Sequence, residues 1–335
     1  MAVMSRAIVE ASARRLLKGP RRPGWNWTVE IGTQVLKQQI QAAFRMHDVK
    51  RARRFLDSVI LESPTAAQVN NVDVLEDAVS GRWIIPRHSV PQATVLYLHG
   101  GGYSFYPKSF YAQFITLIAL SANSRTFALD YRLTPEHRFP TQLQDALAAY
   151  RWLLNTGTSP TELVIAGDSA GGNMTLGLLL SLRNLQLPLP ALAIALSPPT
   201  DFAVDLTHGV PNAEFDWVNQ QMLVEWSGWF CDESQRRDPL ISPIYADLRG
   251  LPPIYMQDGG SEILHDSIQA FADCAKLQGA DVILESWADM NHDFQFYGNL
   301  APQSADALRR IGEVIESRVP RAADANSKPA EHSST

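Results

Sequence analysis

The chain has 335 residues, of which 45% are hydrophobic and 19% charged, and its formal net charge is −6. This is an ordinary globular composition, and the length suits one large α/β domain with a subdomain or two domains. The negative charge gives no reason to expect nucleic acid as a partner. Two cysteines without nearby histidines exclude a disulfide framework and argue against zinc, so we expect free thiols in a reduced cytoplasm.

The N-terminal residues 1–60 have a helical pattern that is broken by glycine and proline at residues 19–24. Residues 5–18 carry an apolar face formed by Val9, Ala13, Leu16 and Leu17, with basic residues near the other face. Such a helix could lie on a membrane surface, but packing on its own protein is the favoured interpretation. No apolar stretch reaches the length of a signal-peptide core or a membrane span.

From about residue 72 short apolar strands alternate with amphipathic helices. The predicted strands are residues 72–75, 81–86, 94–98, 125–130, 163–166, 191–196, 253–257 and 282–287. The predicted helices are residues 109–121, 141–154, 174–184, 268–277 and 305–319. The alternation after residue 94 indicates βαβ units, and therefore an α/β fold with a largely parallel sheet.

The alternation is interrupted at residues 201–238, which are rich in aromatic residues and have a helical pattern. We interpret this stretch as an insertion that joins residues 1–60 in a cap over the carboxyl edge of the sheet. The catalytic domain would then comprise residues 72–200 and 239–318. Residues 320–335 lack large apolar side chains and are predicted to form a disordered tail.

The sequence Gly-Asp-Ser-Ala-Gly at residues 167–171 lies where a predicted strand becomes a helix. It fits the G-x-S-x-G pattern of a sharp, strained turn that exposes a serine hydroxyl, here that of Ser169. The helix that begins near Ala170 offers free N–H groups and the positive end of a dipole to an oxyanion. A glycine-rich turn with an incidental serine is the alternative, which the strand-to-helix context disfavours.

A second motif, His-Gly-Gly-Gly at residues 99–102, directly follows the predicted strand 94–98. Consecutive glycines leave backbone N–H groups unshielded, and such a loop accompanies the serine turn in lipases and esterases. The phosphate-binding and dinucleotide-binding patterns are both incomplete here. His99 is interpreted as a structural residue that organises the loop, because a general base must reach the serine hydroxyl.

A serine hydroxyl needs a base to act as a nucleophile at neutral pH. Of eight histidines, His292 is the best candidate because it follows the last predicted strand, and this class orders its residues as Ser, acid and His. The acid should follow the strand at residues 253–257, where Asp258, Glu262 and Asp266 compete. Either an aspartate or a glutamate can hold the imidazole and stabilise its charged form.

Four motifs together resemble the hormone-sensitive-lipase-like branch of the α/β-hydrolases, a family of carboxylesterases and lipases. They are Gly-Asp-Ser-Ala-Gly-Gly-Asn at 167–173, His-Gly-Gly-Gly-Tyr at 99–103, Asp-Tyr-Arg-Leu-Thr-Pro-Glu-His-Arg-Phe-Pro at 130–140, and Leu-Ser-Pro at 196–198. The similarity covers about residues 72–318. It implies a mostly parallel eight-stranded sheet flanked by helices, with a helical cap built from the N-terminus and the insertion after the sixth strand.

Carried onto this chain, the resemblance makes Ser169 the nucleophile and His292 the base. It makes Gly101, Gly102 and Ala170 the donors of backbone N–H groups to the oxyanion. The family's usual acid is the first aspartate of D-P-L-R-D. Here Glu262 stands in that place, in Glu-Ile-Leu-His-Asp at residues 262–266, and we favour it over Asp266 and Asp258.

The resemblance implies ester hydrolysis through an acyl-enzyme, with no metal and no organic cofactor. We expect a small-molecule ester with a short to medium acyl chain, held in an apolar pocket. The residues expected to contact it are Tyr103, Trp25, Phe202, Phe215 and Trp217. A non-catalytic receptor on the same fold, an amidase, a thioesterase and an acyltransferase are the alternatives. We expect a cytoplasmic protein without stable membrane insertion, and leave homodimer formation open.

Overall fold

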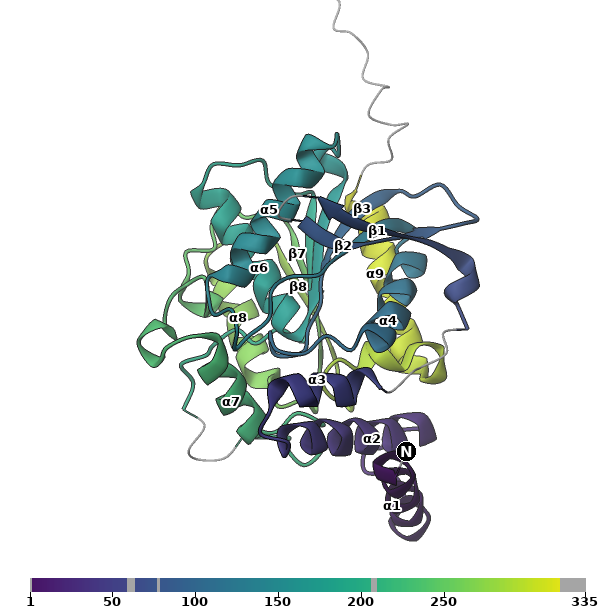
Figure 1. Ribbon diagram of the computed structural model, residues 1–335. Helices are drawn as coiled ribbons and strands as arrows, with labels where there is room; N and C mark the ends of the chain where they lie inside the picture. The colour runs from purple at the N-terminus through teal and green to yellow at the C-terminus, as the bar shows by residue number, and fades with distance from the viewer. Residues whose placement is uncertain (1, 59–63, 77–78, 206–209, 320–335) are drawn as a thin grey trace, which may run out of the picture.

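An eight-stranded sheet with the order β1-β2-β4-β3-β5-β6-β7-β8 forms the centre of the molecule (Figure 1). The structure is a computed structural model that describes residues 2–58, 64–76, 79–205 and 210–319. The strands are β1 (Val69–Glu76), β2 (Val79–Pro86), β3 (Ala93–Leu98), β4 (Ser124–Leu129), β5 (Leu163–Asp168), β6 (Leu192–Leu196), β7 (Ile254–Gly259) and β8 (Val282–Trp287). β2 pairs antiparallel with β1 and β4, and the other neighbours are parallel. The predicted α/β fold class is confirmed, whereas the predicted tail at 320–335 lies outside the described residues.

Helices cover both faces of this sheet. One face packs against α4 (Lys108–Ser121) and α9 (Pro302–Arg318), and the other against α5 (Thr141–Asn155), α6 (Ser169–Asn184) and α8 (His265–Leu277) (Figure 1). Side chains of a strand point alternately to its two faces, so each strand contributes to both layers. On β3, Leu96 and Leu98 join the cluster under α5 and α6, while Val95 and Tyr97 join the one under α4 and α9.

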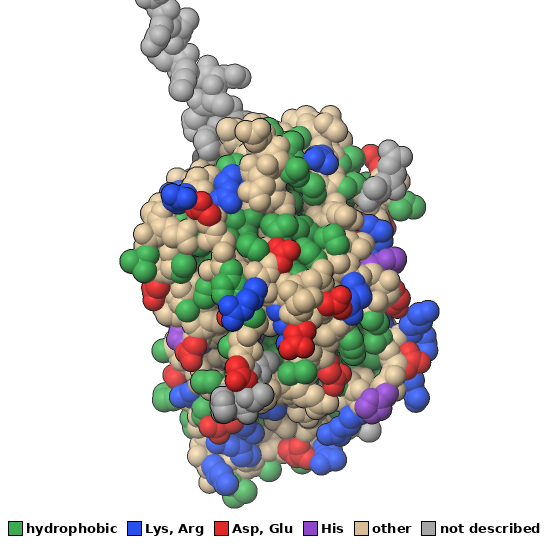
Figure 2. Space-filling model, turned by 90° about the vertical axis from the view of Figure 1, so that its left-hand side faces the viewer, with side chains coloured by type: hydrophobic (Ala, Val, Ile, Leu, Met, Phe, Trp, Pro, Cys, Tyr) green, Lys and Arg blue, Asp and Glu red, His purple; other side chains and the backbone are tan. Residues whose placement is uncertain are grey.

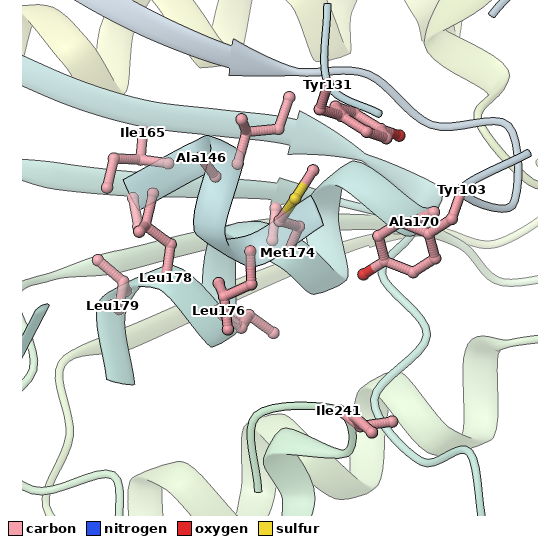
Figure 3. Packing of buried hydrophobic residues seen from close by; sticks show 14 of the residues in the cluster. Tyr103, Tyr131, Ala146, Ile165, Ala170, Met174, Leu176, Leu178, Leu179 and Ile241 are labelled. Atoms are coloured by element: carbon pink, nitrogen blue, oxygen red, sulfur yellow. The ribbon is translucent and has the colours of Figure 1, made fainter. Parts of the chain in front are cut away.

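Helix α6 is buried over most of its length. Every residue from Ser169 to Leu182 is buried, and its apolar side chains pack with those of α5 and β5 (Figure 3). The close approach of α6 to β3 requires glycine, because a Cβ on Gly171 would overlap the carbonyl oxygen of Leu98. The start of α6 is therefore held rigidly against the sheet.

The N-terminal helices α1 (Ala2–Lys18), α2 (Trp27–Phe44) and α3 (Val49–Asp57) lie with α7 (Gln220–Phe230) at one end of the sheet, below it in Figure 1. The buried carboxylate of Glu30 on α2 pairs with Arg14 and Arg15 of α1 at 3.1 and 3.2 Å. None of the helices within the described ranges is long and apolar enough to cross a bilayer.

The predicted packing face of α1 was wrong. Val9, Leu16 and Leu17 are 66%, 75% and 82% exposed, whereas Ala7 and Ala11 are buried. The reason is that α1 is held to α2 by ion pairs to Glu30 and by small alanines that permit close approach, rather than by its large apolar residues.

The prediction that residues 201–238 are largely helical was also wrong. Their only α-helix, within the part that the structure describes, is α7, and turns precede it. The side chain of Asn219 accepts a hydrogen bond from the Met222 N–H, which fixes the start of α7 at Gln220.

On the face that Figure 2 shows, Lys and Arg side chains are interspersed with Asp and Glu, and hydrophobic side chains lie between them.

Candidate active site

Ser169 occupies a sharp corner between β5 and α6. β5 ends at Asp168, α6 begins at Ser169, and the φ of Ser169 is 49°. This left-handed backbone conformation is uncommon for residues other than glycine and persists only where the surroundings enforce it. The buried strand and the buried helix on either side supply that enforcement, and the corner borders a cavity. The local geometry is that of a nucleophile turn.

His292 lies in the loop after β8, and its Nε2 is 2.9 Å from the Oγ of Ser169. Its side chain is almost completely buried. The loop is anchored by Trp217, whose Nε1 donates a hydrogen bond of 2.8 Å to the backbone carbonyl of His292. The structure thus brings together the serine and the histidine that the sequence singles out, although 123 positions separate them.

Glu262 faces the other nitrogen of this imidazole. Its Oε1 lies 3.7 Å from the Nδ1 of His292, and neither atom has another hydrogen-bond partner within the described chain. Its second oxygen, Oε2, accepts hydrogen bonds from the Oγ of Ser197 at 2.6 Å and the N–H of Gly259 at 2.9 Å. This separation is longer than a hydrogen bond. A small movement would close it.

The two competing carboxylates are placed differently. Asp258 is buried, but it is engaged by His265 Nδ1 at 2.6 Å and by the Oγ of Ser286 at 2.5 Å. Asp266 is exposed on the first turn of α8 and borders the same cavity as Ser169. Of the three carboxylates, Glu262 is the one that faces His292.

Burial sets the electrostatics of the site. It lowers the pKa of His292 below 6.5 and raises the pKa of Glu262 to about 8. Asp293, with Oδ2 3.2 Å from the Nε2 of His292, is also buried, which raises its pKa well above the ordinary aspartate value. The lowered pKa of His292 favours the neutral imidazole, which is the form that can accept a proton.

The glycine loop is tied to the serine corner by Asp168. Its buried carboxylate accepts hydrogen bonds from Tyr97 at 2.7 Å, Tyr111 at 2.8 Å and the N–H of Gly100 at 3.1 Å. Burial raises the pKa of Asp168 to about 6. Because Asp168 immediately precedes Ser169, these bonds hold the loop and the corner in a fixed relation.

His99 packs inside this loop rather than facing the serine. Its ring is stacked between Tyr106 and Tyr131, with centroids 3.8 and 4.1 Å away, and its Nδ1 hydrogen-bonds the Gly100 carbonyl at 2.7 Å. Burial lowers the pKa of His99 to about 3, so the ring is neutral and Nδ1–H is the donor. This agrees with the structural role inferred for it.

A cavity of about 240 Å³ opens above the serine. Ser169, His292, Gly102 and Ala170 border it, whereas Gly101 borders a neighbouring apolar cavity. The φ values of Gly101 and Gly102, 91° and 60°, are in the region that favours glycine. Of the three residues expected to bind an oxyanion, Gly102 and Ala170 therefore border the cavity beside Ser169, and Gly101 does not.

The expected substrate contacts divide into two groups. Tyr103 and Phe202 line the cavity beside Ser169. Trp25 and Phe215 do not: Trp25 packs with Val29 in a separate apolar cluster, and Phe215 lies against that cluster with the Arg22 guanidinium 3.8 Å from its ring centre. These two expectations were wrong, because both rings serve packing between the N-terminal helices and the rest of the fold.

Trp217 is the third residue whose position differs from the predicted contact with the substrate. It borders the neighbouring apolar cavity rather than the one that holds Ser169, and it acts on the site through its bond to the His292 carbonyl. The sequence pattern marked it only as one aromatic residue among several. Its polar Nε1 contributes to this position, because it donates its hydrogen bond to the His292 carbonyl.

A family model described as the alpha/beta hydrolase fold matches residues 95–296. The chain belongs to the α/β-hydrolase fold family. An acetyl-hydrolase of Streptomyces hygroscopicus is 33% identical over 237 residues, covering 70% of this chain and 79% of that protein. A solved esterase of the bacterial hormone-sensitive lipase family superposes with a TM-score of 0.73 at 32% identity, covering 96% of this chain and 99% of that one.

The esterase EstE5, in crystals soaked with p-nitrophenyl butyrate, gives a TM-score of 0.76 at 29% identity and covers 93% of this chain and 98% of its own. The resemblance to the hormone-sensitive-lipase-like branch is confirmed. Because its relatives include proteins named esterase and carboxylesterase, the chain is a carboxylic ester hydrolase, as predicted.

Two polar residues hold Glu262 and its neighbour in place, and the sequence analysis did not single out either of them as a site residue. Ser197 donates to Glu262 and also accepts a bond of 3.2 Å from the N–H of Asp293. Its φ of 44° and its place in the Leu-Ser-Pro motif at residues 196–198 were available signals. No sequence pattern could have identified Asp216, because it lies in the insertion and contacts Ile263, the neighbour of Glu262, only in the folded chain.

Asp216 connects the insertion to the acid. Its Oδ2 accepts a 2.7 Å bond from the N–H of Ile263, next to Glu262, and its Oδ1 accepts one of 2.7 Å from the N–H of Trp217. Its backbone carbonyl accepts a 2.9 Å bond from Lys37 of α2. One carboxylate thus joins segments that carry the acid and the anchor of the histidine loop.

Replacing Asp216 with asparagine is expected to lower the free energy of unfolding by about 1–3 kcal/mol, because an amide N–H would face a backbone N–H. Turnover of p-nitrophenyl acetate should fall on the order of 10- to 100-fold through misplacement of the reacting groups. Thermal unfolding and steady-state kinetics measure the two effects. Glu214→Gln, an exposed change two residues away, is the control, and equal behaviour of both variants would contradict the assigned role.

Proposed function

We propose that this hydrolase is a serine carboxylesterase that cleaves short- to medium-chain acyl esters through an acyl-enzyme, with Ser169, Glu262 and His292 as its triad. The observation that carries the proposal is the 2.9 Å contact between the Nε2 of His292 and the Oγ of Ser169 at the wall of an open cavity. A neutral imidazole beside a serine hydroxyl is the arrangement that activates the oxygen for attack.

The chemistry follows from the two nitrogens of His292. The Oγ of Ser169 attacks the ester carbonyl carbon while Nε2 takes the hydroxyl proton. The tetrahedral intermediate collapses, the bond to the alcohol oxygen breaks, and Nε2 returns the proton to the leaving alcohol. Water then attacks the acyl-enzyme with the same assistance and releases the acid and Ser169. Glu262 stabilises the transient imidazolium from the side of Nδ1.

The negative oxygen of each intermediate would be bound by the N–H groups of Gly101, Gly102 and Ala170. Support comes from the positions of Gly102 and Ala170 at the cavity wall beside Ser169. Ala170 also lies in the first turn of α6, where N–H groups have no partner within the helix and the dipole is positive. Loss of one such donor typically costs about 100- to 1000-fold in turnover.

The size of the cavity supports a short acyl chain. Its volume of about 240 Å³ is below the range of roughly 300–1,000 Å³ that is usual for small-molecule sites. Tyr103, Phe202 and Trp226 give it aromatic walls. The similar esterase EstE5 was soaked with a butyrate ester, which is consistent with a substrate of this class.

The triad is tested by comparing two buried carboxylates. Glu262→Gln should reduce turnover of p-nitrophenyl butyrate by roughly 10⁴-fold, as loss of the triad acid does elsewhere. Ser169→Ala should abolish both the pre-steady-state burst and turnover. Asp258→Asn is the matched control, since its carboxylate binds His265 and Ser286 instead. Loss of activity in Asp258→Asn with retention in Glu262→Gln would reassign the acid.

The pH dependence follows from burial of His292. The base must be neutral, and its pKa lies below 6.5, so activity should persist as pH falls through 6.5 and be lost only below that pKa. The measurement is kcat/KM against pH for a neutral ester, with tryptophan fluorescence to detect unfolding. An acid limb with an apparent pKa at or above 6.5 would be inconsistent with a buried neutral imidazole.

Chain-length preference is measured with p-nitrophenyl esters from acetate to palmitate. The highest kcat/KM should fall between acetate and hexanoate, because a cavity of about 240 Å³ has little room for a longer acyl chain. All esters are measured below their micelle-forming concentrations, so that the rates compare substrates in the same monomeric state. An optimum on palmitate would exclude the proposed substrate class.

A further inference from the structure

A second cavity lies behind the glycine loop, between that loop and the N-terminal helices. Its volume is about 140 Å³, and its walls are almost entirely apolar. Helix α2 contributes Val35, Leu36 and Ile40, and the far side is formed by Phe105 and Phe296. The reaction described above uses none of these five side chains.

The indole ring of Trp226 borders both cavities. It is 8% exposed, comes from α7, and packs so closely on the glycine loop that a Cβ on Gly102 would overlap it. Gly102 borders the cavity of Ser169 and Gly101 borders the second one. The ring therefore stands where the two cavities come together, directly beside the expected oxyanion donors.

The ring is held by packing rather than by polar contacts. The ring of Phe44 meets it edge-on with centroids 5.4 Å apart, and its Nε1 has no hydrogen-bond partner among the described residues. A buried indole N–H without an acceptor is unusual, so replacing this ring breaks no recorded hydrogen bond. Removal of the side chain would create a cavity but would not leave another polar group without its hydrogen-bond partner.

We propose that Trp226 is the partition that separates the catalytic cavity from the second apolar cavity and thereby limits the length of the acyl chain. The inference rests on the proposed esterase function and names the residue that sets its specificity. With the ring removed, an acyl chain attached at Ser169 can pass the glycine loop and bury its distal methylenes against α2. Each methylene so buried should raise kcat/KM about fourfold, from the transfer free energy of a buried CH₂.

The experiment compares kcat/KM of the wild type and Trp226→Ala on p-nitrophenyl esters from acetate to decanoate, all below micelle-forming concentrations. The variant should gain about 60-fold for three methylenes beyond the wild-type limit, at the fourfold step per methylene. The kcat/KM of each ester is divided by that of the same protein on acetate, so that any general effect of the change on the neighbouring glycine loop cancels. Trp226→Leu gives the same readout with a smaller loss of packing, should Trp226→Ala not fold.

Trp229→Ala is the matched control. Trp229 lies three residues further along α7 and stacks on Phe44 at 5.7 Å, but it borders neither cavity. It should keep the wild-type chain-length profile. Adding Leu36→Phe to Trp226→Ala refills the second cavity and should remove the gain on long chains.

Three results would overturn the inference. They are an unchanged profile in both Trp226 variants, an equal gain in Trp229→Ala, and a gain that survives the addition of Leu36→Phe. In each of these cases the proteins still hydrolyse short esters, so the proposed function stands. If the wild type hydrolyses no ester of the series, the proposed esterase function is wrong. The experiment therefore distinguishes failure of the proposed function from failure of the role assigned to Trp226.

Discussion

The site depends on one strained corner. Ser169 is held in a left-handed backbone conformation because β5 and α6, both fully buried around it, leave the chain no other path between them. The cost of this conformation is met by the apolar core on both sides of the corner. Asp168 then ties the same corner to the glycine loop through the N–H of Gly100, and to β3 and α4 through the hydroxyls of Tyr97 and Tyr111. The nucleophile and the expected oxyanion donors are therefore one rigid unit.

The proposed acid, Glu262, and the proposed base, His292, reach this unit from loops that follow β7 and β8. The loop after β8 carries His292, and its carbonyl is held by Trp217 of the insertion. Ser197 and Gly259 hold one oxygen of Glu262, while the other faces the imidazole and has no hydrogen-bond partner in the part of the chain that the structure describes. The insertion is thus part of the catalytic geometry as well as of the cavity wall. Burial keeps the imidazole neutral, as proton transfer from serine requires.

Specificity has a different physical origin from catalysis here. The catalytic groups are positioned by hydrogen bonds and backbone strain, whereas the cavity is shaped by aromatic rings that pack without strict polar requirements. Trp226 illustrates the difference, since its ring fits against Gly102 while its N–H has no hydrogen-bond partner within the described ranges of the chain. Changes in such rings alter the available volume and leave the hydrogen bonds around Ser169 in place. Chain-length preference is therefore open to change without loss of the reaction.

The sequence by itself determined the α/β fold class, the serine turn and the glycine loop, because these follow from local backbone requirements and from strand and helix periodicity. The expectation that His292 pairs with Ser169 came from the chain order Ser, acid, His of this class of enzyme. The family resemblance favoured Glu262 over Asp258 and Asp266, whereas only the tertiary structure shows that Asp258 binds His265. The same holds for Trp25 and Phe215, which pack away from the cavity. Partners of buried polar groups and the faces of aromatic rings depend on contacts between distant segments, and no local pattern encodes them.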